Sequence, residues 1–120
     1  MKKTTLVIGA SLNPNRYSNI AIKRLIDKNI KTFAVGLRKG KVHNVVIETE
    51  KLLFDDIDTV TLYLKPKRQE EYYNYILELN PRRVIFNPGT ENFEFIKILK
   101  ENGVESEIAC TLVLLSTNQY

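Results

Sequence analysis

Short apolar runs alternate with amphipathic segments along the chain, and most of these runs end at a glycine or a proline-containing turn. Runs of this length that are rich in β-branched residues are typical of buried strands. The sequence therefore predicts five strands, at residues 4–8, 31–36, 59–64, 84–86 and 104–109. A further apolar patch at residues 45–47 is too short to be assigned to a helix or a strand.

The segments between these runs have the spacing of helices. In residues 18–30 the apolar side chains recur every three or four positions, and charged side chains occupy the opposite face. The same pattern predicts helices at residues 66–79 and 91–102, followed by a short helix that starts near residue 111. Asn80-Pro81 and Gly103 supply the stop signals of the two middle helices.

Strands that alternate with helices indicate parallel crossovers with helices on both faces of one sheet. We expect a doubly wound, Rossmann-like α/β fold with a five-stranded parallel sheet in the order 3-2-1-4-5, numbered along the chain. A flavodoxin-like order is the alternative. The 120 residues contain no repeat and no linker, so a single domain spanning residues 1–120 is expected.

Composition narrows the class of protein. The chain is 43% hydrophobic and 27% charged, which is typical of a globular protein, and its net charge of +4 suits an anionic ligand but not nucleic acid. One cysteine, Cys110, cannot form an internal disulfide. The apolar stretch Leu6–Ile8 is too short for a signal peptide, and no segment is long enough to span a membrane. We expect a cytoplasmic protein without membrane or nucleic-acid partners.

The loops that follow the strands are the candidate binding sites, because ligands of such sheets bind at the carboxyl ends of the strands. The first loop, Gly9-Ala10-Ser11 and onward through Asn13 and Arg16, leads into a helix whose amino-terminal N–H groups suit a phosphate. This loop is not the G-x-G-x-x-G fingerprint of dinucleotide-binding proteins, since its second and third glycines are absent.

The loop after the second strand indicates the type of ligand. NAD-binding proteins usually carry an acidic residue here, which accepts hydrogen bonds from the ribose hydroxyls. Residues 36–41 contain no acid and three cations, Arg38, Lys39 and Lys41. This composition suits a ribose that bears a phosphate, as in NADP or in coenzyme A (CoA).

Candidates for catalysis are few. His43 is the only histidine and has no carboxylate or cysteine near it in the sequence, so a metal site is not expected. Cys110 has no neighbouring histidine, and an inert buried thiol is the better interpretation. No acid–base constellation is visible, and we therefore expect a protein that is not an enzyme.

Five segments, in this order, resemble the small stand-alone CoA-binding domain proteins, which are similar to the nucleotide-binding domain of the succinyl-CoA synthetase alpha subunit. The segments are VIGASLNPNRYS, FAVGLRKGKVHNVVIET, TLYLKPKRQ, IFNPGTEN and CTLVLL. In one segment the chain departs from the family, which often has Val-Asn-Pro where this sequence has Val35-Gly36-Leu37.

The resemblance implies a role for each loop. Four sets of residues would face successive parts of CoA: Gly9, Ala10, Ser11, Asn13, Arg16 and Tyr17 at the pyrophosphate; Arg38, Lys39 and Lys41 at the adenosine 3′-phosphate; Lys65 and Pro66 at the adenine and ribose; Asn87, Pro88 and Gly89 at the pantetheine.

The expected function is non-catalytic binding of CoA or an acyl-CoA, as a carrier, a sensor or a partner subunit. Two alternatives stay open: a minimal NADP-binding oxidoreductase or its nucleotide-binding subunit, and a protein-interaction module that has lost its ligand. The partner would be a small nucleotide ligand, and a homodimer or a partner enzyme subunit are the assemblies considered.

Overall fold

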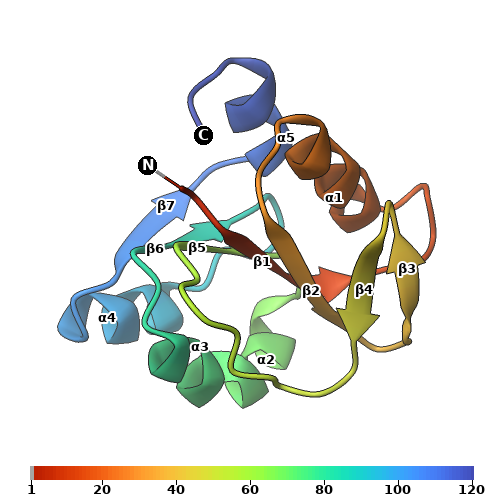
Figure 1. Ribbon diagram of the computed structural model, residues 1–120. Coiled ribbons are helices and arrows are strands. Elements are labelled where there is room, and N and C mark those ends of the chain that lie inside the picture. The colour runs from red at the N-terminus through yellow and green to blue at the C-terminus, as the bar shows by residue number, and fades with distance from the viewer. Residues whose placement is uncertain (1) are drawn as a thin grey trace.

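The strands form one seven-stranded sheet in the order β3-β4-β2-β1-β5-β6-β7, in a computed structural model that describes residues 2–120 (Figure 1). Every neighbouring pair is parallel except β3 and β4, which are antiparallel. The strands are β1 (Thr5–Ala10), β2 (Thr32–Gly36), β3 (Gly40–Val42), β4 (Val45–Glu48), β5 (Thr59–Leu62), β6 (Arg83–Phe86) and β7 (Glu105–Ile108).

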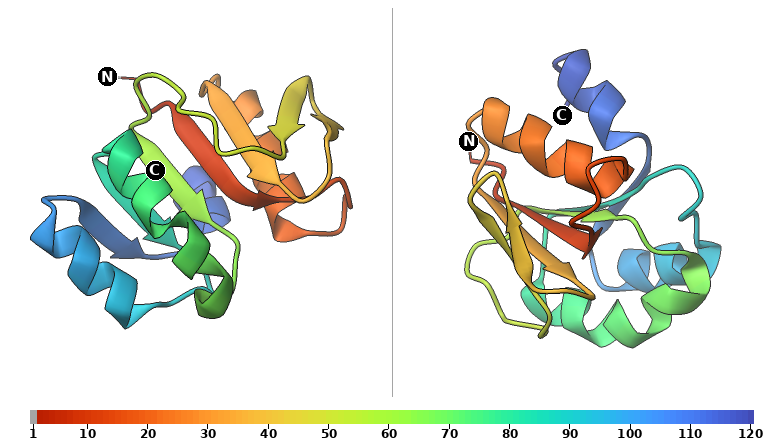
Figure 2. Two further views of the ribbon diagram at one scale, coloured as in Figure 1. Left: turned by 90° about the horizontal axis from the view of Figure 1, so that it is seen from below. Right: turned by 90° about the vertical axis from the view of Figure 1, so that its right-hand side faces the viewer.

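Helices cover both faces of the sheet, as Figures 1 and 2 show. Helices α1 and α5 lie over one face, and α2, α3 and α4 lie over the other. The helical segments are α1 (Tyr17–Asp27), α2 (Pro66–Gln69), the 3₁₀ turn η1 (Glu70–Tyr72), α3 (Tyr73–Leu79), α4 (Phe93–Glu101) and α5 (Thr111–Ser116). Because successive strand residues point to opposite faces, Leu6 and Ile8 pack in one core and Val7 packs in the other. In the described chain, no helix has the length and apolar character that a membrane span requires.

The mostly parallel α/β sheet with helices is confirmed, but the predicted strand number and order are wrong. Residues 59–62 do not pair with β2. They pair with the other side of β1, in the register Thr5↔Thr59. The place beside β2 belongs to β4, with Ala34 opposite Ile47.

This error arose because β4 is only four residues long and is reached without a helix. A two-residue turn at His43 and Asn44, both at positive φ (48° and 69°), joins β4 to β3 in an antiparallel hairpin. Positive φ at both central residues is the signature of a type I′ hairpin turn, and asparagine is favoured there.

The predicted helix at residues 66–79 is three consecutive segments, α2, η1 and α3. The interruption lies at Glu70–Tyr72, next to the fully buried Gln69. This arrangement turns the side chains of Gln69, Tyr72 and Tyr75 toward the sheet.

Two arginines near the amino-terminal ends of β5, β6 and β7 are paired with acids. Arg82 donates from Nε to Asp58 Oδ1 at 2.9 Å and from Nη1 to Glu105 Oε2 at 3.4 Å. Arg83 is 5% exposed. It donates to Thr59 Oγ1 at 2.9 Å and to Glu107 Oε2 at 3.0 Å, and its guanidinium lies 4.4 Å from the ring centroid of Tyr120.

Candidate functional site

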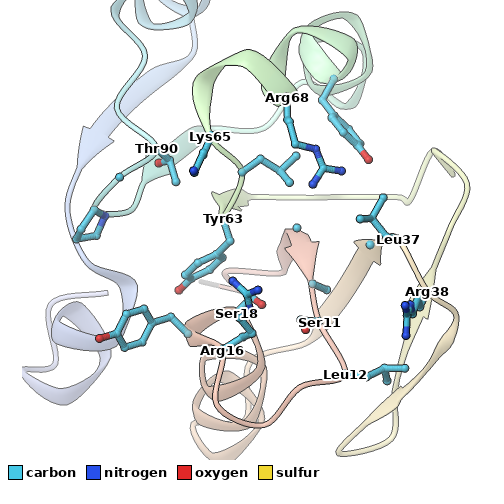
Figure 3. Close-up of a pocket in the computed structure, with 18 residues that line it drawn as sticks. Ser11, Leu12, Arg16, Ser18, Leu37, Arg38, Tyr63, Lys65, Arg68 and Thr90 are labelled. Atoms are coloured by element: carbon cyan, nitrogen blue, oxygen red, sulfur yellow. The ribbon is translucent and has the colours of Figure 1, made fainter.

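A pocket of about 470 Å³ opens at the carboxyl ends of β1, β2, β5 and β6 (Figure 3). It lies where the sheet is wound in opposite directions, with β2 on one side of β1 and β5 on the other. Ligands of doubly wound sheets bind at this switch point. The lining comes from four segments of the chain, Gly9–Ser18, Gly36–Arg38, Tyr63–Tyr72 and Pro88–Thr90.

Two glycines pack the floor of the pocket so tightly that no other side chain fits. Gly9 has φ +90°, and a Cβ atom there would lie 2.9 Å from the backbone C and O atoms of Tyr63. A Cβ on Gly36 would lie 2.3 Å from the carbonyl oxygen of Ala10. The ends of β1, β2 and β5 therefore approach each other closely, and backbone forms the floor beneath the ligand position.

The loop from β1 to α1 is held by hydrogen bonds that involve Ser11, Asn13 and Asn19 of α1. Asn13 Oδ1 accepts from the Asn15 N–H at 2.9 Å, and Ser11 Oγ accepts from the Asn13 N–H at 3.1 Å. The buried Asn19 donates from Nδ2 to the Ser11 carbonyl at 2.9 Å. These bonds fix the path of the loop and leave the start of α1 facing the pocket.

The amino terminus of α1 is open to an anion. Its N-cap residue, Arg16, makes no side-chain cap, and the first turn carries no acid. Within residues 2–120 the N–H groups of Tyr17 and Ser18 have no acceptor. Free N–H groups at the positive end of a helix dipole bind phosphate and carboxylate groups.

The opposite wall is held by a buried amide, Gln69. Its Nε2 donates to the Leu64 carbonyl at 2.8 Å and to the Thr90 carbonyl at 2.7 Å. Its Oε1 accepts from Asn92 Nδ2 at 3.0 Å, while Asn92 also caps α4 through the Phe95 N–H. One side chain thus joins the loop after β5 to the loop after β6.

The pocket is cationic. Four basic side chains line it, from three of its loops: Arg16, Arg38, Lys65 and Arg68. Among the described residues, none of the four has a salt-bridge partner, and the lining holds no Asp, Glu, His or Cys. Figure 3 shows Arg68 reaching into the pocket from α2 and Arg38 lying beside Leu12 and Leu37. Unpaired cations around a concave, carboxylate-free surface attract a multiply charged anion.

Two tyrosines of the lining, Tyr63 and Tyr72, are held in the neutral form. Burial raises the pKa of Tyr63, an effect that the nearby hydroxyls of Thr61 and Thr111 partly oppose. Burial and the charge of Glu71 raise the pKa of Tyr72, against the opposing charge of Arg68. Neither phenol serves as a base near neutral pH.

Nine of the fourteen residues predicted for the site come together in this lining. They are Gly9, Ala10, Ser11, Arg16, Tyr17, Arg38, Lys65, Pro88 and Gly89. The other five, Asn13, Lys39, Lys41, Pro66 and Asn87, lie outside it.

Three of these five have structural contacts that account for their position. Asn13 shapes its own loop, and Lys39 lies 3.6 Å from Glu48 Oε1. Asn87 is buried and bridges three elements: Nδ2 donates to Thr61 Oγ1 (2.7 Å) and to the Leu62 carbonyl (2.9 Å), and Oδ1 accepts from the Thr111 N–H (2.8 Å). Lys41 lies exposed on β3, and Pro66 begins α2.

The sequence prediction also missed residues of the lining. They are Leu12, Ser18, Gly36, Leu37, Tyr63, Leu64, Arg68, Tyr72 and Thr90. Arg68 was detectable, because it lies three positions after the predicted Lys65 at the start of a helix and so shares its face. Gln69 gave no such signal, because its neighbours in the sequence are charged and its burial could not be predicted from them.

The chain belongs to the CoA binding domain family, whose model matches residues 3–116. A crystal structure of an uncharacterized protein has 48% sequence identity and a TM-score of 0.97, and the match covers 100% of this chain and 99% of that chain. No protein of curated function matches.

Two more distant structures share the fold. A hypothetical protein from Pyrococcus horikoshii OT3 has 27% identity and a TM-score of 0.87, over 97% of this chain and 83% of that chain. A dinucleotide forming acetyl-coenzyme A synthetase 1 from Ca. Korarchaeum cryptofilum, in complex with phosphate and ADP, has 10% identity and a TM-score of 0.73. That match covers 88% of this chain and 25% of the synthetase chain, and shows a common fold.

Proposed function

We propose that this protein binds CoA or an acyl-CoA in the pocket at the carboxyl ends of β1, β2, β5 and β6, and does not transform it. Such a protein serves as a carrier, a sensor or a partner subunit. The observation that carries the proposal is the set of four unpaired cations, Arg16, Arg38, Lys65 and Arg68, around the open amino terminus of α1. Membership of the CoA binding domain family supports the choice of ligand.

The chemistry of the lining matches the charges of CoA. CoA carries a pyrophosphate and a separate phosphate on the 3′ position of its ribose. The N–H groups of Tyr17 and Ser18, with Arg16, suit the pyrophosphate. Arg38 and Arg68, which line the pocket away from Arg16, suit a second phosphate at a distance from the first.

The same lining favours binding without catalysis. The hydroxyls of Ser11 and Ser18 have no histidine or carboxylate beside them among the pocket residues, so neither is activated as a nucleophile. The hydroxyls of Tyr63 and Tyr72 stay protonated, because burial raises the pKa of each. A bound thioester would therefore meet no general base.

A second candidate function is NADP binding by a nucleotide subunit of an oxidoreductase. It is favoured by one observation, the cation Arg38 after β2 where NAD-binding folds usually place an acid. CoA and NADP both carry a pyrophosphate and a ribose phosphate, so the two candidates differ in what lies beyond the pyrophosphate.

Calorimetric titration and thermal melting with CoA, acetyl-CoA, 3′-dephospho-CoA, NADPH and NADH distinguish these candidates. We expect CoA and acetyl-CoA to bind, dephospho-CoA to bind roughly tenfold or more weakly, and NADPH to be displaced by CoA. Ligand at about 100 times its dissociation constant adds about 2.7 kcal/mol to the free energy of unfolding, which a melt detects. Binding of NADPH that CoA does not displace would establish the second candidate, and no response to any ligand would contradict both.

A further inference from the structure

The hydroxyl of Tyr63 is buried and, within residues 2–120, has no hydrogen-bond partner. Tyr63 directly follows β5 and lines the pocket, and its backbone is the surface on which Gly9 packs. Figure 3 shows its side chain and that of Arg16 extending toward each other from different walls. A buried hydroxyl without a partner is costly and rare in folded proteins, so its presence at a binding site calls for a physical reason.

The surrounding hydroxyls bond to one another instead of to Tyr63. Thr61 Oγ1 and Thr111 Oγ1 are 2.8 Å apart, and Asn87 Nδ2 donates to the same Thr61 oxygen at 2.7 Å. Both threonines lie close enough to lower the pKa of Tyr63. Their oxygens are already engaged with each other and with Asn87, and neither reaches hydrogen-bond geometry with the phenol. The cluster behind the pocket is satisfied without the phenol.

Two tyrosines that pack in the core on the other face of the sheet do have partners. The Tyr75 hydroxyl donates to the Leu52 carbonyl, and the Tyr73 hydroxyl accepts from Asn92 Nδ2 at 2.8 Å. Both lie on α3, outside the pocket lining. The buried hydroxyl without a partner thus belongs to a tyrosine of the pocket lining.

The chemistry of the free hydroxyl defines what it can bind. Burial holds the phenol in its protonated form, so it is a donor at physiological pH. Phosphate oxygens are acceptors, and at the start of α1 the N–H groups of Tyr17 and Ser18 are free to donate hydrogen bonds to them.

We propose that Tyr63 is a specificity-determining residue whose hydroxyl donates a hydrogen bond to an oxygen of the bound phosphate group. The inference rests on the proposed function, since it assumes that the pocket binds a phosphorylated ligand. In the empty protein the hydroxyl is covered. Arg16 is exposed and extends toward Tyr63, and we expect the hydroxyl to become accessible to the phosphate when Arg16 moves onto the bound ligand.

The proposal gives Tyr63→Phe a signature that a structural role would not produce. Phenylalanine keeps the packing and removes a hydroxyl that has no partner in the empty protein, so the melting temperature without ligand stays the same or rises. The bound phosphate loses one donor, so affinity falls by roughly tenfold or more. A residue that only supports the fold would lower both quantities together.

Tyr75→Phe is the matched control. It removes the same atom from a tyrosine whose hydroxyl does have a partner, the Leu52 carbonyl. We expect a lower melting temperature and an unchanged ligand affinity, the opposite of the effects at Tyr63.

The experiment is calorimetric titration of the wild type and both variants with CoA and with inorganic pyrophosphate, together with melts of each empty protein. A loss of roughly tenfold in Tyr63→Phe, for CoA or for pyrophosphate, with no loss of melting temperature supports the inference. Unchanged affinity for both ligands overturns it. A lower melting temperature with unchanged affinity also overturns it, because a water molecule then satisfies the hydroxyl in the empty protein.

The two ligands separate failure of the inference from failure of the proposed function. If the wild type binds pyrophosphate but not CoA, the proposed function fails and the pyrophosphate titration alone decides the role of Tyr63. If the wild type binds CoA and Tyr63→Phe binds it equally well, only the inference fails. If the wild type binds neither ligand, both are wrong.

Discussion

The two ends of the parallel sheet use their arginines in opposite ways. At the amino-terminal ends of β5 and β6, Arg82 and Arg83 are bonded to Asp58, Glu105 and Glu107. At the carboxyl ends, Arg16, Arg38 and Arg68 face a pocket whose lining holds no acid among the described residues.

The difference separates arginines that stabilise the fold from arginines that are available to bind a ligand. A paired or stacked arginine contributes to the stability of the folded state, whereas an unpaired one near like charges contributes little or opposes it. Cations that have no acidic partner around a pocket are therefore the ones that a bound anion neutralises. Removing an arginine should cost stability at one end of the sheet and affinity at the other.

The largest effect is expected from Arg83→Met at the paired end. The change removes hydrogen bonds to Thr59 and Glu107 and the contact with the Tyr120 ring. Glu107 is partly exposed and regains water, so we expect a loss of about 2–3 kcal/mol in the free energy of unfolding. Urea denaturation measures this loss. Calorimetry should show unchanged CoA affinity, and a folded variant that has lost CoA binding would break the distinction between the two ends.

Arg68→Ala at the unpaired end should cost affinity alone. It removes one cation from the pocket, and we expect CoA to bind roughly tenfold more weakly with the free energy of unfolding unchanged. Lys67→Ala is the matched control, because Lys67 is exposed on the same helix, α2, but lies outside the lining. Equal losses of affinity in both variants would mean that net charge, and not the site, governs binding.

Asp58→Asn tests the paired end through pH. Burial alone would raise the pKa of Asp58, but hydrogen bonds from Arg82 and Thr59 and the charges of Arg82 and Arg83 hold it below the ordinary value of 3.8. A carboxyl whose pKa is lowered by folding stabilises the native state above its ordinary pKa, and this contribution is lost as pH falls through the lowered value.

The wild type should therefore exceed Asp58→Asn in the free energy of unfolding near neutral pH, by no more than about 1 kcal/mol because Arg82 is partly exposed. The gap should close below about pH 4. Urea denaturation across this range measures it, and a gap that widens in acid would contradict the assigned pairing.

The smallest effect is expected from Lys39→Ala. This lysine follows β2, as Arg38 does, but it lies near Glu48 and outside the pocket lining. We expect CoA affinity to change by less than about twofold. Arg38→Ala, the matched variant in the lining, should weaken binding by roughly tenfold in the same titration. A larger loss for Lys39→Ala would place the 3′-phosphate on the outer part of this loop.

The part of the pocket that the sequence predicted is its floor, which is made by backbone. A β-branched run ending at Gly9 and followed by a helix indicates a phosphate loop, and the structure shows the reason: only glycine fits against the Tyr63 backbone. The wall made by side chains was harder to predict. Gln69 is fully buried and joins two loops, yet its neighbours in the sequence are charged and exposed.

The order of the sheet could not be derived from strand patterns alone. β4 is short, and the segment from β4 to β5 crosses without a helix, covering the sheet instead with a loop in which Phe54 stacks on Phe33 at 4.4 Å. No helix therefore marks the crossover from β4 to β5, and the alternation of strands and helices does not reveal β4 as a strand of the sheet. The His43-Asn44 turn was the available signal, because asparagine at a tight turn between short apolar runs is typical of a hairpin.

The most direct test of the account is calorimetric titration of CoA into the wild type, Arg16→Ala and Arg82→Ala. Arg16 lines the pocket at the open start of α1, and Arg82 is paired at the other end of the sheet. We predict that the wild type and Arg82→Ala bind CoA with equal affinity and that Arg16→Ala binds it roughly tenfold more weakly. No binding by the wild type, or equal losses in the two variants, would contradict the account.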